Sequence, residues 1–317
     1  MKRLLLALLF CQTPAVFAGE GFEIEYKGEP TEVQVTLDGK DYTRLRFNRV
    51  PFLYPLTSSS GAILNRHWPT DDSVKDEERD HPHHQSLWLS HGDVNGHDYW
   101  AWTTKESKPE IAFKGLKDKQ KDSFTLSLDW TAAGKTDLKE ERTYRFHKFD
   151  AETTGIEVTS KLTAADGDAT FGDTKEGFFA VRVDRTLRLA PPKGKDPAGA
   201  KGHIADSEGR KDGESWGKKS KWVAFYGPDE KGEPAVIAMF DHPSNLRHPT
   251  TWHARDYGLL AANPFGIHDF ENKKDQPHLG DHVLKKGETL TFRYEVILHH
   301  GSLESAKIAD RWAEFSK

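Results

Sequence analysis

Short runs in which apolar and polar residues alternate, or in which β-branched and aromatic residues dominate, constrain the fold of this chain most strongly. Six such runs are residues 22–27, 32–38, 42–47, 123–130, 139–149 and 291–299. Three further runs are almost continuously apolar, as strands buried on both faces are, and these are residues 177–183, 222–226 and 235–240. Alternation with a period of two predicts β-strands. We therefore expect an all-β fold, and so many strands in a chain of 317 residues favour one large antiparallel β-sandwich.

One helix is expected, and it lies at the C-terminus. Ile308, Trp312 and Phe315 share one helical face there, and Ser302 is placed to cap the start of the helix. Residues 190–221 are rich in Gly, Lys, Pro and Asp, which predicts a surface loop between strands. We expect a single β-sandwich domain over residues 19–317, with two smaller sandwiches split near residues 190–221 as the alternative.

The first 18 residues have the pattern of a cleavable secretory signal peptide. Lys2 and Arg3 precede a short apolar run, and Val16-Phe17-Ala18 is a typical cleavage signal. Cleavage after Ala18 would place the mature protein in the periplasm or outside the cell. Cys11 is the only cysteine, so the mature chain contains no disulfide, thiol nucleophile or cysteine metal ligand.

Charge and hydropathy exclude several functional classes. The formal net charge is −5 and becomes −7 when the signal with its two cations is removed, and lysines are dispersed rather than clustered. This composition indicates neither a nucleic-acid partner nor a basic membrane-binding surface. No later stretch approaches 18 continuous apolar residues, so no membrane span is expected. Phosphate-binding and dinucleotide-binding glycine motifs and the G-x-S-x-G motif are all missing from the sequence, so a nucleotide cofactor is not expected.

Three segments interrupt the strand pattern with dense polar and aromatic residues, and they are residues 79–100, 171–183 and 241–270. Each adjoins a strand, so in a sandwich they can meet over one concave face. The first contains five histidines, which are His81, His83, His84, His91 and His97. Histidine exchanges protons near neutral pH, so such a cluster favours acid–base chemistry over a set of loop hydrogen bonds.

A metal site is the alternative use of these histidines. His81 and His83 are two residues apart, so in an extended segment they face the same way while His84 faces the opposite way. With His248, His253 or an acid, His81 and His83 could bind a divalent metal ion such as Zn²⁺, Fe²⁺ or Mn²⁺. Because no local motif supplies three ligands at a recognised spacing, the preferred expectation is that the protein uses no metal or other cofactor.

The same segments resemble a bacterial family filed as "methane oxygenase PmoA". The resemblance lies in residues 80–100, 172–183, 242–255, 263–266 and 298–301, and it covers most of the mature chain. The name implies a membrane monooxygenase. With no membrane-spanning stretch after the signal and a mean hydropathy of −0.73, we do not expect methane oxidation. The all-β pattern instead looks like the galactose-mutarotase-like supersandwich of several sugar-active enzymes, which is an analogy of fold alone.

The histidines, carboxylates and tryptophans of these segments together favour a carbohydrate-active protein. It would act on a sugar or glycoside with a histidine acid and a carboxylate base, in an epimerase, hydrolase or lyase reaction. The expected catalytic residues are His84, His248 or His253 as the acid and Glu176 as the base. The expected substrate-binding residues are His81, His91, Asp93, Asn95, Trp100, Arg182, His242, Asn245, Trp252 and Asn263. A histidine-ligated metal enzyme and a non-catalytic sugar-binding protein are the alternatives.

Overall fold

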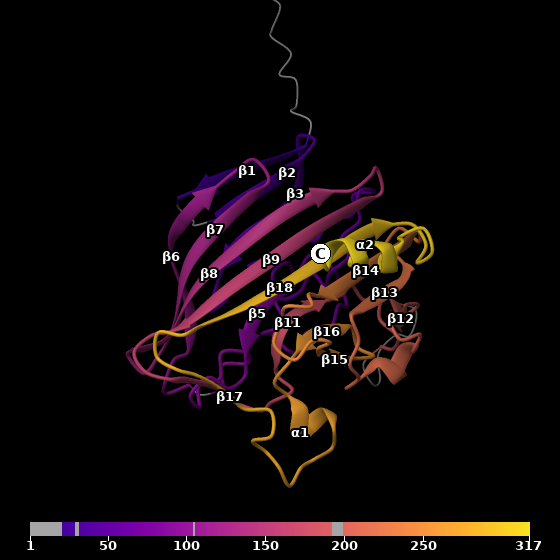
Figure 1. The fold of residues 1–317 in the computed structure, drawn as a ribbon. Coiled ribbons are helices and arrows are strands. Elements are labelled where there is room, and N and C mark those ends of the chain that lie inside the picture. The colour runs from indigo at the N-terminus through magenta and orange to yellow at the C-terminus, as the bar shows by residue number, and fades with distance from the viewer. Residues whose placement is uncertain (1–20, 29–31, 104, 192–198) are drawn as a thin grey trace, which may run out of the picture.

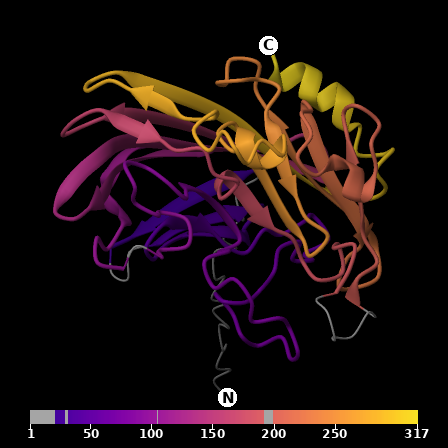
Figure 2. The ribbon, with the colours of Figure 1, turned by 90° about the horizontal axis from the view of Figure 1, so that it is seen from below.

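The computed structural model describes residues 21–28, 32–103, 105–191 and 199–317, which form two large antiparallel sheets (Figures 1 and 2). The first sheet has eight strands in the order β1 (Phe22–Lys27), β2 (Glu32–Leu37), β3 (Lys40–Phe47), β4 (Pro51–Leu53), β5 (Leu87–His91), β11 (Gly177–Arg182), β16 (Leu259–Asn263) and β15 (Thr251–Ala254). The second has eight in the order β12 (His203–Asp206), β13 (Trp222–Pro228), β14 (Pro234–Asp241), β18 (Thr289–His300), β9 (Thr153–Ala164), β8 (Lys135–Lys148), β7 (Ser123–Ala132) and β6 (Glu110–Lys119). The predicted all-β antiparallel sandwich is confirmed.

The main core lies between the two sheets. In β7 every second side chain from Phe124 to Trp130 is buried, as the alternating pattern requires. Phe179 of β11 stacks on Tyr294 of β18 at 4.9 Å, which joins the faces of the two sheets. A buried hydrogen bond also joins them, because Arg142 of β8, which is paired with Glu140 of the same strand, donates to the carbonyl of Leu89 in β5.

Two short elements complete the fold beside the sandwich. Strands β10 (Ala169–Phe171) and β17 (His282–Leu284) form a two-stranded sheet, and helix α1 (Ile267–Phe270) lies in the loop between β16 and β17 (Figure 1). No helix within the described ranges is long and apolar enough to cross a membrane. The predicted signal peptide, residues 1–18, lies outside the described residues.

The C-terminal helix α2 (Ile308–Phe315) packs on the outer face of the second sheet, over β13 and β14 (Figure 1). The predicted apolar face is confirmed, because Ile308, Trp312 and Phe315 all contact the apolar cluster there. The predicted cap at Ser302 is wrong. Ser302 accepts a hydrogen bond from Ala306 in a separate turn, and Lys307 with φ of 48° separates that turn from the helix.

All nine predicted runs form strands, and the structure contains further strands that the sequence pattern does not reveal. The largest omission is β9, a twelve-residue strand at the centre of the second sheet. The predicted loop at residues 190–221 is also partly wrong, because it contains strand β12 and the short 3₁₀ helix η2 (Asp212–Ser215). Strand β12 pairs with β13 and is too short to show a clear period in the sequence. Residues 192–198 of this segment lie outside the described residues.

Candidate functional site

A cavity of about 660 Å³ is the place where the three polar segments meet. Four neighbouring strands of the first sheet, β5, β11, β16 and β15, bring them together. The lining comes from the turn before β5, the residues just after β5, the residues before β11 and the β15–β16 hairpin. The lining residues are His81, His83, His84, Gly92, Asp98, Ala101, Thr103, Thr174, Lys175, Glu176, His253, Arg255 and Tyr257.

The histidines before β5 lie in a turn and not in an extended segment, which corrects the expected geometry. His81 has a φ of 47°, and the backbone N–H of His84 donates to the carbonyl of His81 at 3.0 Å. The turn folds the ring of His84 back onto that of His81, and the two stack at 4.7 Å. His84 therefore lies on the same side as His81. His83 contacts the edge of both rings.

Two buried arginines hold the turn of His81–His84 in place by binding Asp80. Arg66 donates to the Asp80 carboxylate and to the backbone carbonyls of Asp80, His81 and His84. Arg182, from the end of β11, donates to both Asp80 oxygens. Partial burial acts to raise the pKa of Asp80, but the hydrogen bond with His81 and the charges of Arg182 and Arg66 outweigh it and lower that pKa. Asp80 is therefore a fixed negative charge beneath the histidines.

His81 is held between Asp80 and Tyr257. Its Nδ1 lies 2.8 Å from Asp80 Oδ2, and its ring stacks on the Tyr257 ring at 5.4 Å with an interplanar angle of 8°. The His81 side chain keeps 40% of its surface exposed. A carboxylate on Nδ1 fixes the proton there, so Nε2 is the nitrogen left to exchange protons with a ligand.

His84 is a neutral hydrogen-bond donor. Its Nδ1 lies 3.0 Å from an Arg182 nitrogen, and because a guanidinium only donates, Nδ1 must accept. The proton of the neutral ring is then on Nε2. Burial, followed by the nearby Arg182 charge, holds the pKa of His84 well below its ordinary value.

His253 of β15 and Glu176, the residue before β11, line other parts of the cavity. His253 Nδ1 donates to the carbonyl of Lys175 at 3.1 Å, which leaves Nε2 as an acceptor. Glu176 is only partly exposed, and its closest cation is Lys175, whose Nζ lies 3.6 Å away. Glu176 can pack against the backbone of residue 92 only because that residue is glycine. A Cβ on Gly92 would come within 2.9 Å of the Glu176 backbone and side chain.

Arg255 adds a cation that no carboxylate of the described residues neutralises. Its guanidinium lies 3.4 Å from His253 Nε2 and 5.1 Å from the centre of the Tyr257 ring. The Arg182 guanidinium also lies over the Tyr257 ring, 4.5 Å from its centre. The cavity therefore presents an accepting carboxylate, a guanidinium without a carboxylate partner and imidazoles of both tautomers to one bound molecule.

Buried histidines around this site make stability depend on pH. Burial lowers the pKa of both His91 and His253 to about 4. In the unfolded chain the value is about 6.5, so unfolding takes up protons below that pH. The stabilisation is complete above pH ~6.5 and is lost as the pH falls towards ~4. At pH ~5.5 we expect each histidine to reduce the free energy of unfolding by about 1 kcal/mol, measured by urea unfolding.

The variant His91→Gln is expected to lose part of this pH dependence, whereas His278→Gln, at an exposed position, is expected to keep all of it. An identical pH dependence in His91→Gln would contradict the pKa shift of His91.

Comparison with known proteins identifies a family. Residues 32–313 match the model described as "Family of unknown function (DUF6807)". The chain belongs to this family. No curated protein matches the sequence. Among solved structures, the chain is similar to a galactose mutarotase related enzyme from Lactobacillus acidophilus, with 12% identity over 61% of this chain and 73% of that one and a TM-score of 0.24. The resemblance to the "methane oxygenase PmoA" family stays a resemblance of motifs.

Of the other expected site residues in this DUF6807 chain, three lie directly beneath the cavity. Arg182 anchors the histidine turn as described. Trp100 is buried, with its ring 4.8 Å from Trp88 and 6.0 Å from His84. His91 is buried below Gly177, and its Nε2 bonds the carbonyl of Gly172. These residues support the lining without contributing to it.

Three more expected residues hold the surrounding loops. Asn263 donates to the carbonyl of Thr174 and accepts from two backbone N–H groups after it, so it positions the segment that carries Glu176. Asp93 accepts the N–H of Gly96. Asn95 bonds Asp137 and the backbone of Thr170. Neither Asp93 nor Asn95 lines the cavity.

The structure places the remaining expected residues away from the cavity. His248, expected as an acid, bonds the buried Asp241 at 2.7 Å and stacks on Trp312 of α2. Asn245 donates to the same Asp241, and His242 bonds Ser244 and Arg293. Trp252 is fully buried and donates its indole N–H to the carbonyl of Ser220. His248, Asn245 and His242 lie where β14, β18 and α2 meet, whereas Trp252 belongs to β15 and the main core.

Sequence reasoning missed several residues that shape the site, which are Arg66, Asp80, Asp98, Lys175, Arg255 and Tyr257. Asp80 directly precedes the histidine run, so its proximity to His81 was readable from the sequence. Arg66 comes from a distant loop and gives no local signal. Within the described residues, no three His, Cys, Asp or Glu side chains are grouped as a metal ion would require.

Proposed function

We propose that this chain is a carbohydrate-active enzyme and that the 660 Å³ cavity is its active site. The observation that carries the proposal is that His81, held at Nδ1 by Asp80, and the Glu176 carboxylate line the same cavity. General acid–base catalysis needs two such groups facing one bound molecule. The hydroxyls of Thr103 and Thr174, the imidazoles and Arg255 are suited to a ligand rich in hydroxyl groups.

In the proposed step, Glu176 accepts a proton from the sugar while His81 Nε2 donates a proton to the oxygen on which negative charge develops. Epimerisation and elimination begin with such a proton transfer. In glycoside hydrolysis the carboxylate would instead take the proton from the attacking water, while the acid protonates the leaving-group oxygen. The step needs no cofactor, because both proton-transfer groups are side chains.

This proposal exchanges the roles expected from the sequence for His81 and His84. A lowered pKa makes the protonated form of His84 unfavourable, so it is a poor proton donor. As a neutral ring it can still donate its Nε2–H to a sugar oxygen and orient it. His81 is the more exposed of the two, and because Asp80 bonds its Nδ1, its Nε2 is the nitrogen that faces a ligand.

The test is a survey of neutral and acidic saccharides with the purified mature protein. Optical rotation would report epimerisation, released reducing ends would report hydrolysis, and ultraviolet absorbance would report the unsaturated product of elimination. We expect turnover in one of these assays. Saccharide binding without turnover in all three would contradict the enzymatic proposal and favour a sugar-binding protein.

We also propose that the protein is exported and that residues 1–18 are removed. This rests on the charged head, apolar run and cleavage pattern of the N-terminus. We expect the exported protein to begin at Gly19, as measured by intact mass. A mass that includes residues 1–18 would contradict it.

A further inference from the structure

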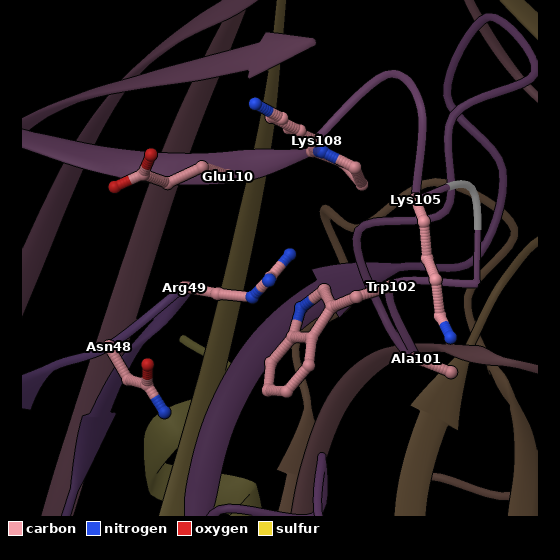
Figure 3. A pocket seen from close by; sticks show the side chains of 8 residues that line it. Asn48, Arg49, Ala101, Trp102, Lys105, Lys108 and Glu110 are labelled. Atoms are coloured by element: carbon pink, nitrogen blue, oxygen red, sulfur yellow. The ribbon is translucent and has the colours of Figure 1, made fainter.

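A second cavity, of about 730 Å³, lies next to the first. Ala101 lines both cavities, so the two share a wall. Trp102 faces the second cavity while Thr103 lines the first. In Figure 3 the Trp102 indole lies in the middle of the second cavity, with Arg49 on one side of it in the view and Lys105 on the other.

The position of Trp102 is held by the backbone. Trp102 has a φ of 59°, which is unfavourable for a bulky side chain and costs about 1–3 kcal/mol. Asp98 holds this conformation, because its carboxylate accepts the N–H groups of Trp100, Ala101 and Thr103. Such strain is typical of functional sites, and here it presents a partly exposed indole to the cavity.

Trp102 also connects the two cavities. Its ring lies 6.4 Å from the ring of His83, which lines the first cavity, and the Arg49 guanidinium lies 5.5 Å from its centre. A ligand that spans both cavities would therefore pass over one continuous surface.

The charge of the second cavity is opposite to that of the protein. Arg49, Lys105 and Lys108 face it, with Glu110 as the one acidic side chain of its lining. Among the described residues, none of the three cations forms an ion pair with a carboxylate. The chain as a whole carries a net charge of −5. Unneutralised cations in an acidic protein indicate an anionic ligand.

We infer that the second cavity is a binding subsite for an anionic sugar unit, a uronate or a sulfated sugar, adjacent to the unit that reacts in the first cavity. This inference rests on the proposed function. Trp102 would pack against the apolar face of the sugar ring, and Arg49, Lys105 and Lys108 would pair with its carboxylate or sulfate. Asn48 supplies an amide for its hydroxyl groups.

The test compares three monosaccharide probes by isothermal titration calorimetry on the mature protein, which are D-glucuronate, D-glucose 6-sulfate and D-glucose. We expect at least one anionic probe to bind about tenfold more tightly than glucose, with an affinity that falls as salt is added. A stronger response to glucuronate or to the sulfate identifies which anion is recognised.

Variants locate the binding. The triple variant R49Q/K105Q/K108Q is expected to lower the affinity for the anionic probe about tenfold or more, and Trp102→Leu to weaken it as well. Lys274→Gln removes an exposed lysine elsewhere and is the matched control, expected to bind normally. Equal binding of all three probes, no anion binding at all, or unchanged affinity in the triple variant would overturn the inference.

The variant Glu176→Gln separates this inference from the proposed function. We expect it to keep its affinity for the anionic probe, because Glu176 lines only the first cavity. If no saccharide is turned over but anion binding still depends on the three cations, the proposed function fails and the subsite stands. If turnover occurs without such binding, the subsite fails alone.

Discussion

Replacing Glu176 by Gln or His81 by Asn is expected to lower kcat on the cognate saccharide by about 10²–10⁴-fold. Both substitutions keep the approximate shape of the side chain and remove its ability to exchange a proton. Because each group acts in the transition state, KM is expected to change much less than kcat. Steady-state rates of the purified variants, with their unfolding curves as a check on folding, measure this effect.

The double variant E176Q/H81N sharpens the test, because residues that act in one step lose activity non-additively. We expect the double variant to be little slower than the slower single variant. His203→Gln is the matched control, since His203 is an exposed histidine on β12, outside both cavities. Retention of turnover within about twofold by both single variants would show that His81 and Glu176 are not the acid–base pair.

Arg182→Met is expected to reduce the free energy of unfolding by about 2–4 kcal/mol. The change leaves Asp80 without one of its two arginines and His84 without the donor on Nδ1. Removing one partner of a buried ion pair is strongly destabilising, but Asp80 keeps Arg66 and is one third exposed, so the full range is not expected. Urea unfolding at neutral pH measures the loss.

Two further variants show which property of Arg182 stabilises the fold. Arg182→Lys keeps the charge but lacks the second nitrogen needed to reach both Asp80 and His84, so an intermediate loss is expected. Arg79→Met removes an exposed arginine close in sequence to the same turn and is expected to change stability by less than about 0.5 kcal/mol. If Arg182→Met were as stable as Arg79→Met, the histidine turn would not depend on Arg182.

The sequence predicts the strands better than the site, for a physical reason. Alternation reports which face of a strand is buried, and β7 and β18 show it clearly. The convergence of segments around the cavity also followed from the density of polar residues. The orientation of His81 and His84 did not, because the positive φ at His81 makes a turn where an extended segment was assumed.

The same limit explains the histidines that lie elsewhere. His242 and His248 share the His-Pro pairing of His81, but His242 bonds Arg293 of β18, which is 51 residues away, and His248 bonds Asp241 at the end of β14. The pairing of β14 with β18 brings Arg293 next to His242, although the two residues are far apart in the sequence. A residue type and its immediate neighbours therefore identify a proton carrier, whereas its role depends on contacts made by distant strands.

The most direct test of the central claim is a crystal structure of the Glu176→Gln variant with its cognate saccharide bound. The account requires the reacting sugar in the 660 Å³ cavity, with hydrogen bonds to the substituted side chain at position 176 and to Nε2 of His81. A saccharide bound outside this cavity, or one that contacts neither side chain, would contradict it.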